Sequence, residues 1–301
     1  MLKNVLINNK NMTLPLNPTE SYFDPALGTQ TTNALTLSMQ VSLNELSFCI
    51  TDSTQNRHLA FSNYTFGEVV TPFTIYEFID KLFTYETLLK KNFSHIILCY
   101  ENNKSTLIPI EIYKEANKND YLTFNGKVNP DEIVLIDMIR DIESYNVYAI
   151  PSIIEKTLKK KFLVCNFIHQ SSAFIMSLMN NFNKNGHYDD KIYVNVGTNS
   201  FELAAFNEGR FKLYNTFPFK QKEDFIYYIL FAMKQLSMDV NTVELVLSGK
   251  INPNSPLHQI TQKYIANVSF IKRSLLFNYS GSLSEIPAQQ YYSLFNLIRC
   301  V

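Results

Sequence analysis

The stretch "KIYVNVGTNSFELAAFNEGRFKLYNTF", residues 191–217, contains three short apolar runs separated by turn residues. The runs are residues 191–197, 200–206 and 211–217. Each has the length and composition of a strand, and "NEGR" is a turn of the kind that joins antiparallel strands. The stretch therefore predicts a meander of three strands. A helix at 222–238 and an apolar strand at 243–249 follow it.

The same order of elements is predicted in the first half of the chain. Strand-like runs lie at 35–42, 46–52 and 57–66, followed by an amphipathic segment at 74–93 and an apolar run at 95–101. Aligning "QVSLNELSFCI" from Gln40 with "NVGTNSFELAA" from Asn195 places Ser42 over Gly197. Identities are few, so chance is the alternative explanation of this alignment. The matched order of three strands, helix and strand favours a duplication.

The remaining segments complete a two-domain prediction. Further strands are expected at 132–139, 145–150, 162–169 and 267–273, and further helices at 151–162, 171–185 and 255–265. We expect a leader over residues 1–33, which prolines interrupt. A first domain over 34–168 and a second over 169–301 follow, and the last segment is a candidate to pack back on the first domain.

Composition and charge exclude several classes of protein. The chain of 301 residues is 46% hydrophobic with a formal net charge of zero, which is typical of a globular protein and not of a disordered one. No overall field attracts nucleic acid, and we interpret the lysines of 156–161 as the solvated end of a helix. No apolar run is long enough for a transmembrane segment. Four cysteines in apolar runs indicate buried, reduced thiols and predict a cytoplasmic location.

Two units of three antiparallel strands, a crossover helix and a further strand resemble the duplicated ribonuclease-H-like fold of the actin-like ATPase superfamily. That superfamily includes sugar kinases, Hsp70-type chaperones, FtsA and PilM. The chain resembles most an uncharacterised bacterial domain-of-unknown-function family of actin-like proteins, and more distantly the PilM and FtsA type. The resemblance implies an α/β fold with two ribonuclease-H-like domains, whose mixed sheets are flanked by helices.

The resemblance also implies a nucleotide cleft between two phosphate-binding hairpins. The positions that match the superfamily's motifs are Gln40, Ser42 and Asn44 in the first hairpin, Asn195, Gly197, Thr198, Asn199 and Ser200 in the second, and Ser248 and Gly249 on the adenosine side. In the superfamily an aspartate ends each first strand and holds hydrated magnesium or orients the attacking water. Here both positions, Gln40 and Asn195, are neutral amides, which are weak magnesium ligands and cannot act as a general base.

The sequence therefore predicts a degenerate cleft in which neither hairpin carries a carboxylate into the gap. We expect no catalytic residue, no metal site and no cofactor, with ATP and magnesium as the alternative. Asn44 and Asn199 are also explained as turn residues, and Gly197 and Gly249 as points of close backbone packing. Glu202 is expected to face the surface rather than the cleft, and His169 to be a structural histidine.

The helix at 222–238 is apolar on almost every face. Burial on both sides is one explanation, and a docking or dimerisation surface with Tyr227, Tyr228 and Phe231 as anchors is the other. Three functions follow. The first is a non-catalytic scaffold or adaptor, with a protein partner or a second copy of the chain. The second is a divergent ATP-binding switch with weak or no hydrolysis, and the third and least favoured is a small-molecule kinase.

Overall fold

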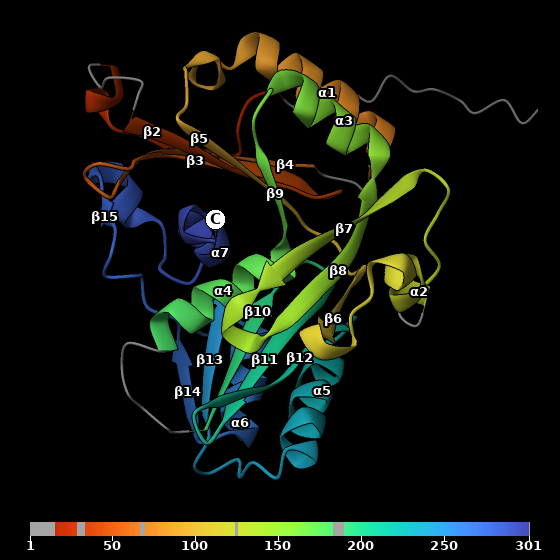
Figure 1. Ribbon diagram of the computed structural model, residues 1–301. Coiled ribbons are helices and arrows are strands. Elements are labelled where there is room, and N and C mark those ends of the chain that lie inside the picture. Colours follow the sequence, from red (N-terminus) through yellow and green to blue (C-terminus); the bar gives the residue numbers. More distant parts are fainter. Residues whose placement is uncertain (1–15, 29–33, 67–69, 124–125, 183–189, 301) are drawn as a thin grey trace, which may run out of the picture.

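The computed structural model describes residues 16–28, 34–66, 70–123, 126–182 and 190–300. These residues form three sheets with helices on their outer faces and between them (Figure 1). The mixed α/β architecture and the duplicated unit predicted from the sequence are both confirmed.

The largest sheet is built from the first half of the chain. Its strands, in spatial order, are β1 (Glu20–Phe23), β4 (Arg57–Thr65), β3 (Glu45–Asp52), β2 (Leu35–Val41), β5 (His95–Tyr100) and β9 (Asn166–His169), and β15 (Asn278–Tyr279) also pairs with β4. β2, β3 and β4 form the predicted antiparallel meander, whereas β5 and β9 run parallel to β2. β1 lies within the predicted leader and was not expected as a strand.

The second sheet repeats this order. It consists of β12 (Arg210–Pro218), β11 (Ser200–Asn207), β10 (Lys191–Val196), β13 (Glu244–Gly249) and β14 (Asn267–Phe270). Each first strand is therefore flanked by its antiparallel hairpin partner on one side and by a parallel strand on the other. Gln40 in β2 lies opposite Ser47, and Asn195 in β10 lies opposite Glu202, so the two amides occupy equivalent positions.

A third sheet distinguishes the first half from the second. β6 (Ser105–Pro109), β8 (Ser144–Pro151) and β7 (Glu132–Ile139) form an antiparallel insertion between β5 and the helix that leads to β9. The short helix α2 (Lys118–Thr123) packs against β8 and β6. The boundary between two domains near residue 168 stays a prediction.

Helices cover the outer faces of the two large sheets and fill the space between them (Figure 1). α1 (Pro72–Tyr85) and α3 (Ser152–Lys161) lie on the first sheet, and α5 (Lys222–Gln235) and α6 (Pro256–Tyr264) lie on the second, whereas α4 (Gln170–Phe182) and α7 (Tyr292–Asn296) lie between the sheets. Thr71 caps α1 by accepting a hydrogen bond from the backbone N–H of Thr74. Among the described residues, no helix has the length and apolar character needed to cross a membrane.

Candidate functional site

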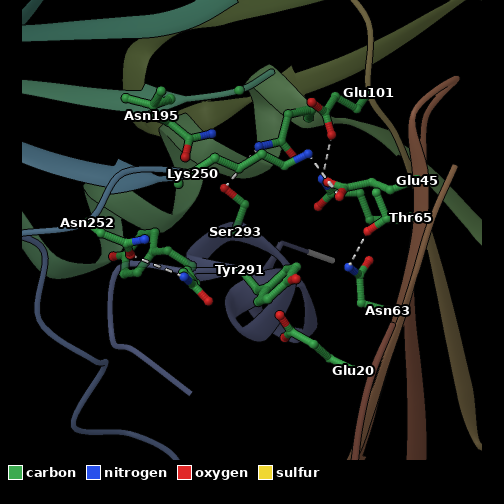
Figure 2. A pocket seen from close by; sticks show the side chains of 17 residues that line it. Glu20, Glu45, Asn63, Thr65, Glu101, Asn195, Lys250, Asn252, Tyr291 and Ser293 are labelled. Carbon is green, nitrogen blue, oxygen red and sulfur yellow. Dashed lines mark hydrogen bonds and ion pairs between the residues drawn. The ribbon is translucent and has the colours of Figure 1, made fainter. Parts of the chain in front are cut away.

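A cavity of about 340 Å³ lies where the two meanders face each other (Figure 2). Its walls come from the ends of β2, β3, β4 and β10, from the starts of β1 and α4, and from the residues after β5 and β13. The segment that precedes and begins α7 completes them. The lining includes the predicted positions Gln40, Asn195, Gly197 and Gly249. The fold therefore brings the strand ends of the two predicted hairpins to one cavity. The other predicted cleft positions do not line it: Ser42, Asn44, Thr198, Asn199, Ser200 and Ser248.

The first hairpin turn is closed by its own serine. The hydroxyl of Ser42 accepts hydrogen bonds from the backbone N–H groups of Asn44 and Glu45, both at 3.1 Å, and the N–H of Ser42 donates to the carbonyl of Glu45 at 2.9 Å. A phosphate-binding turn needs backbone N–H groups that are free to point at the anion. Here these three N–H groups already have partners, so the turn is stable without a ligand.

The second hairpin turn uses glycine for a tight backbone approach. The N–H of Gly197 donates to the carbonyl of Ser200 at 2.8 Å, and a Cβ at Gly197 would lie 2.9 Å from that carbonyl oxygen. Thr198 accepts a hydrogen bond from Lys250 Nζ at 3.0 Å. The backbone carbonyl of Asn199 accepts a hydrogen bond from the N–H of Phe219 at 3.0 Å. Gly197 is thus explained by the geometry of the turn itself.

The two adenosine-side positions, Ser248 and Gly249, are also in tight contact with neighbouring backbone. Gly249 has φ +83°, and a Cβ there would lie 2.3 Å from the carbonyl oxygen of Val196. Its N–H donates to the carbonyl of Gln289 at 2.8 Å. The hydroxyl of Ser248 donates to the carbonyl of Val194 and to Oδ1 of Asn195. Both residues therefore lie where β13 packs closely on β10. Close backbone packing thus explains Gly249.

The two amides that replace the expected aspartates are each bound to a carboxylate. Gln40 Nε2 donates to Oε2 of Glu101 at 2.8 Å, and Asn195 Nδ2 donates to Oε2 of Glu202 at 2.7 Å. An amide can donate in these positions, whereas an ionised aspartate has no proton to give. Gln40 and Asn195 therefore suit the neighbouring glutamates better than ionised aspartates would.

The expectation that Glu202 faces the surface is wrong. Glu202 is buried, and its carboxylate accepts further hydrogen bonds from Tyr214 Oη at 2.7 Å and from Gln170 Nε2 at 3.3 Å. Burial raises the pKa of Glu202, which these hydrogen bonds oppose by stabilising the charged form. Glu202 on β11 lies directly opposite Asn195 on β10, so the two side chains share one face of the sheet.

The expectation that neither hairpin carries a carboxylate into the gap is also wrong. Glu45, at the start of β3, lines the cavity, and its carboxylate binds Lys250 Nζ at 2.9 Å (Figure 2). Lys250 comes from the other sheet, so this ion pair crosses the gap. A second contact crosses nearby, from Ser200 Oγ to Asn103 Oδ1 at 3.2 Å. The two hairpins are therefore joined by groups of the protein itself.

Glu101 and Lys250 are equivalent residues of the duplication. Each directly follows the parallel strand next to the first strand, and each donates its backbone N–H to the last residue of that first strand, Val41 or Val196. Two positions related by the repeat thus carry opposite charges into one cavity. Sequence reasoning missed both, although extending the alignment to "CYE" and "SGK" would have paired them.

Burial and the nearby charge of Glu45 raise the pKa of Glu101 to about 7, while Lys250 and the hydrogen bond from Gln40 oppose the shift. A carboxyl whose pKa is raised by folding stabilises the protein below its unfolded pKa of about 4.3, and this contribution is lost as the pH rises through 7. We therefore expect Glu101→Gln to gain roughly 2 to 3 kcal/mol of unfolding free energy relative to wild type between pH 4.5 and 8.

Urea unfolding at a series of pH values measures this difference. Glu77→Gln, at an exposed position of α1, is the matched control and should follow the wild-type pH dependence. Parallel curves for Glu101→Gln and wild type would show that Glu101 titrates normally.

Other predicted positions lie outside the cavity. His169 is buried, its ring bonds to Ser171 and Asn102, and burial lowers its pKa to about 3, so it has the structural environment that was expected. Tyr227 and Phe231 are exposed on α5, while Tyr228 stacks on Phe217. Within the described part of the chain, no group of three or more His, Cys, Asp or Glu side chains could hold a metal ion.

Comparisons with solved structures show the fold. A Bacteroides thetaiotaomicron protein with an actin-like ATPase fold and unknown function superposes with a TM-score of 0.73 at 20% identity, covering 89% of this chain and 96% of that one. PilM in a PilM–PilN type IV pilus biogenesis complex superposes with a TM-score of 0.64 at 11% identity, covering 88% and 98%. The actin-like arrangement predicted from the duplicated unit is therefore confirmed.

Comparison at the level of sequence assigns the family. No protein with a curated description matches the chain. Residues 24–268, well over half of the chain, match the family described as "Protein of unknown function (DUF3822)". The chain is therefore a member of the DUF3822 family, and it has the actin-like ATPase fold.

Proposed function

We propose that this protein is a non-catalytic scaffold or adaptor that keeps the actin-like shape and does not hydrolyse a nucleotide. The observation that carries this proposal is the pair of amide–carboxylate hydrogen bonds, Gln40 to Glu101 and Asn195 to Glu202. Phosphoryl transfer needs anionic oxygens that hold magnesium and orient the nucleophile. At both positions an amide points its donor group at a glutamate instead.

The charge of the cavity supports the same conclusion. Its lining includes the carboxylates of Glu20, Glu45 and Glu101 and one cationic side chain, Lys250, which is already paired with Glu45. A triphosphate would bring several negative charges into this partly enclosed space, where Coulomb repulsion is stronger than in water. To bind, the nucleotide would also have to displace Lys250 from Glu45.

The C-terminal segment opposes a hinge motion that opens and closes the cleft. Leu294 and Phe295 pack in one cluster with Phe61 of the first sheet, and Tyr292 packs in another with Val246 of the second. Gln170 also joins the two sides, because its amide donates to Glu202 and to the hydroxyl of Ser293. Opening the cleft would separate these buried contacts, so the fold supports a rigid frame better than a switch.

One observation favours the second candidate, a divergent ATP-binding switch. Glu101 lies at a cavity and its pKa is raised to about 7, and perturbed carboxyls of this kind cluster at functional sites. A structural ion network can nevertheless raise the pKa of a carboxyl in the same way, and Glu101 accepts a hydrogen bond from Gln40 and lies near Lys250. The direct test is whether nucleotide binds.

A thermal-shift titration with ATP and magnesium decides between the two candidates. A ligand present at ~100 times its dissociation constant stabilises by ~2.7 kcal/mol, which raises the melting temperature by several degrees. We expect no shift at millimolar Mg·ATP. Magnesium alone and magnesium with inorganic triphosphate are the controls for ionic effects. A saturable shift with Mg·ATP that Lys250→Ala changes would establish the switch and reject the scaffold.

A scaffold acts through a partner, and α5 offers the surface for one. Tyr227 and Phe231 stack with their rings 6.2 Å apart and are 61% and 46% exposed, so they are the anchors we propose for a protein partner or a second copy. The structural relative PilM forms a complex with PilN. We propose a cytoplasmic location, as the cysteine usage predicts.

A further inference from the structure

Two large apolar side chains protrude where α3 ends. Leu163 and Val164, in the connection between α3 and β9, are 97% and 85% exposed. The buried Phe162 separates them from the lysine-rich last turn of α3, Lys159 to Lys161. Burial would recover most of the hydrophobic free energy of such side chains, and within the described part of the chain neither is covered.

Ion pairs neutralise only some of the lysines of α3. Lys159 pairs with Glu155, and Lys161 pairs with Asp80 of α1 at 2.6 Å. Lys156 and Lys160 are exposed and form no ion pair with any described residue. Both line a groove between α1 and α3, whose α1 side carries the 57% exposed ring of Phe73. Exposed lysines of α3 therefore lie close in the chain to the exposed apolar side chains that follow the helix. α1 and α3 lie side by side over the first sheet (Figure 1).

We propose that this tip, defined as Lys156, Lys160, Leu163 and Val164, docks on an anionic lipid surface. Leu163 and Val164 project outward, so their complement is a deformable apolar phase such as the acyl boundary of a bilayer. Lysines on flexible stems match an array of lipid phosphates in charge and tolerate its irregular spacing. The chain has zero net charge, so attraction to anionic lipid has to come from such a local patch.

A fluorescent reporter tests this directly, because the chain contains no tryptophan. Leu163→Trp in the full chain introduces a single indole at the tip, and its exposure means that the fold does not depend on the replaced side chain. We expect its emission to shift to the blue with vesicles of equal parts phosphatidylcholine and phosphatidylglycerol, and to stay unchanged with phosphatidylcholine alone. Phe23→Trp, at a 62% exposed position beside Asp24 with no lysine or arginine within three residues along the chain, is the control and should stay unchanged with both.

Sedimentation with the same vesicles measures the contributions of charge and apolar contact without the reporter. We expect Lys156→Glu with Lys160→Glu, and Leu163→Asp with Val164→Asp, each to lower the lipid partition coefficient by about tenfold or more. Phe23→Asp should bind as wild type does. The proposal is overturned if the Leu163→Trp emission is the same with and without anionic vesicles, or if Phe23→Trp shifts equally. A blue shift with polyglutamate in place of lipid would also overturn it and identify an acidic protein as the partner.

Discussion

Asn195→Asp is expected to lower the free energy of unfolding by about 3 kcal/mol at pH 8 and by much less at pH 5. The substitution replaces the amide that donates to Glu202 at 2.7 Å with a second carboxylate, at a half-buried position beside the buried Glu202. At high pH two negative charges then face each other, and Glu202 loses a charge-assisted hydrogen bond. At lower pH the two carboxyls share a proton, which restores one donor.

The direction of this pH dependence follows from the pKa of the carboxyl pair that Asn195→Asp would create with Glu202. Burial already raises the pKa of Glu202, and a neighbouring carboxylate raises the apparent pKa of the pair further. The variant therefore binds a proton in the folded state that the unfolded state releases near pH 4, so its stability decreases as the pH rises.

Chemical unfolding at pH 5 and pH 8 measures this effect. Asn215→Asp makes the same change at an exposed position of β12 and should alter stability little at either pH. Equal, small effects of the two substitutions would mean that Asn195 does not hold Glu202. Neither Asn195→Asp nor Gln40→Asp alone is expected to produce ATP hydrolysis.

Gly249→Ala is expected to cost about 3 kcal/mol of unfolding free energy or more, or to prevent folding. The added Cβ would lie 2.3 Å from the carbonyl oxygen of Val196 and 2.7 Å from Oδ1 of Asn195. Both contacts are with the first strand of the second meander, so relief requires β13 to move away from β10. The φ of +83° adds the strain that any L side chain meets in this region.

Gly281→Ala separates backbone strain from steric overlap. Gly281 also has a positive φ, but a Cβ there would meet no atom within 4 Å. We expect it to cost about 1 kcal/mol or less, measured by urea unfolding alongside Gly249→Ala. Equal stability of the two variants would mean that β13 does not pack closely enough on β10 at Gly249 to exclude a Cβ.

The fold was predictable because its main elements are long and repeat. β2, β3, β4 and β5 lie within one or two residues of the runs read from the sequence, as do β10 to β13. The missed elements are short or depend on distant contacts. β1 has four residues and is a strand because its backbone pairs with β4, and α7 has five residues, too few to display a helical period.

The candidate site was only half predictable. Aligning the two meanders identified Gln40 and Asn195, because residues at equivalent strand ends share a local pattern. Their partners were missed for a physical reason. Glu101 is brought to Gln40 by a parallel crossover, and Lys250 reaches Glu45 only when the two sheets face each other. Tyr291 of the cavity wall comes from the far end of the chain.

A crystal structure determined after soaking in millimolar Mg·ATP tests the central claim most directly. The account predicts that Lys250 remains bound to Glu45, that Gln40 and Asn195 remain bound to Glu101 and Glu202, and that no nucleotide density lies between the hairpins. A divalent cation held by Glu45 and Glu101, with Lys250 displaced and phosphates against the turn at Gly197, would contradict it.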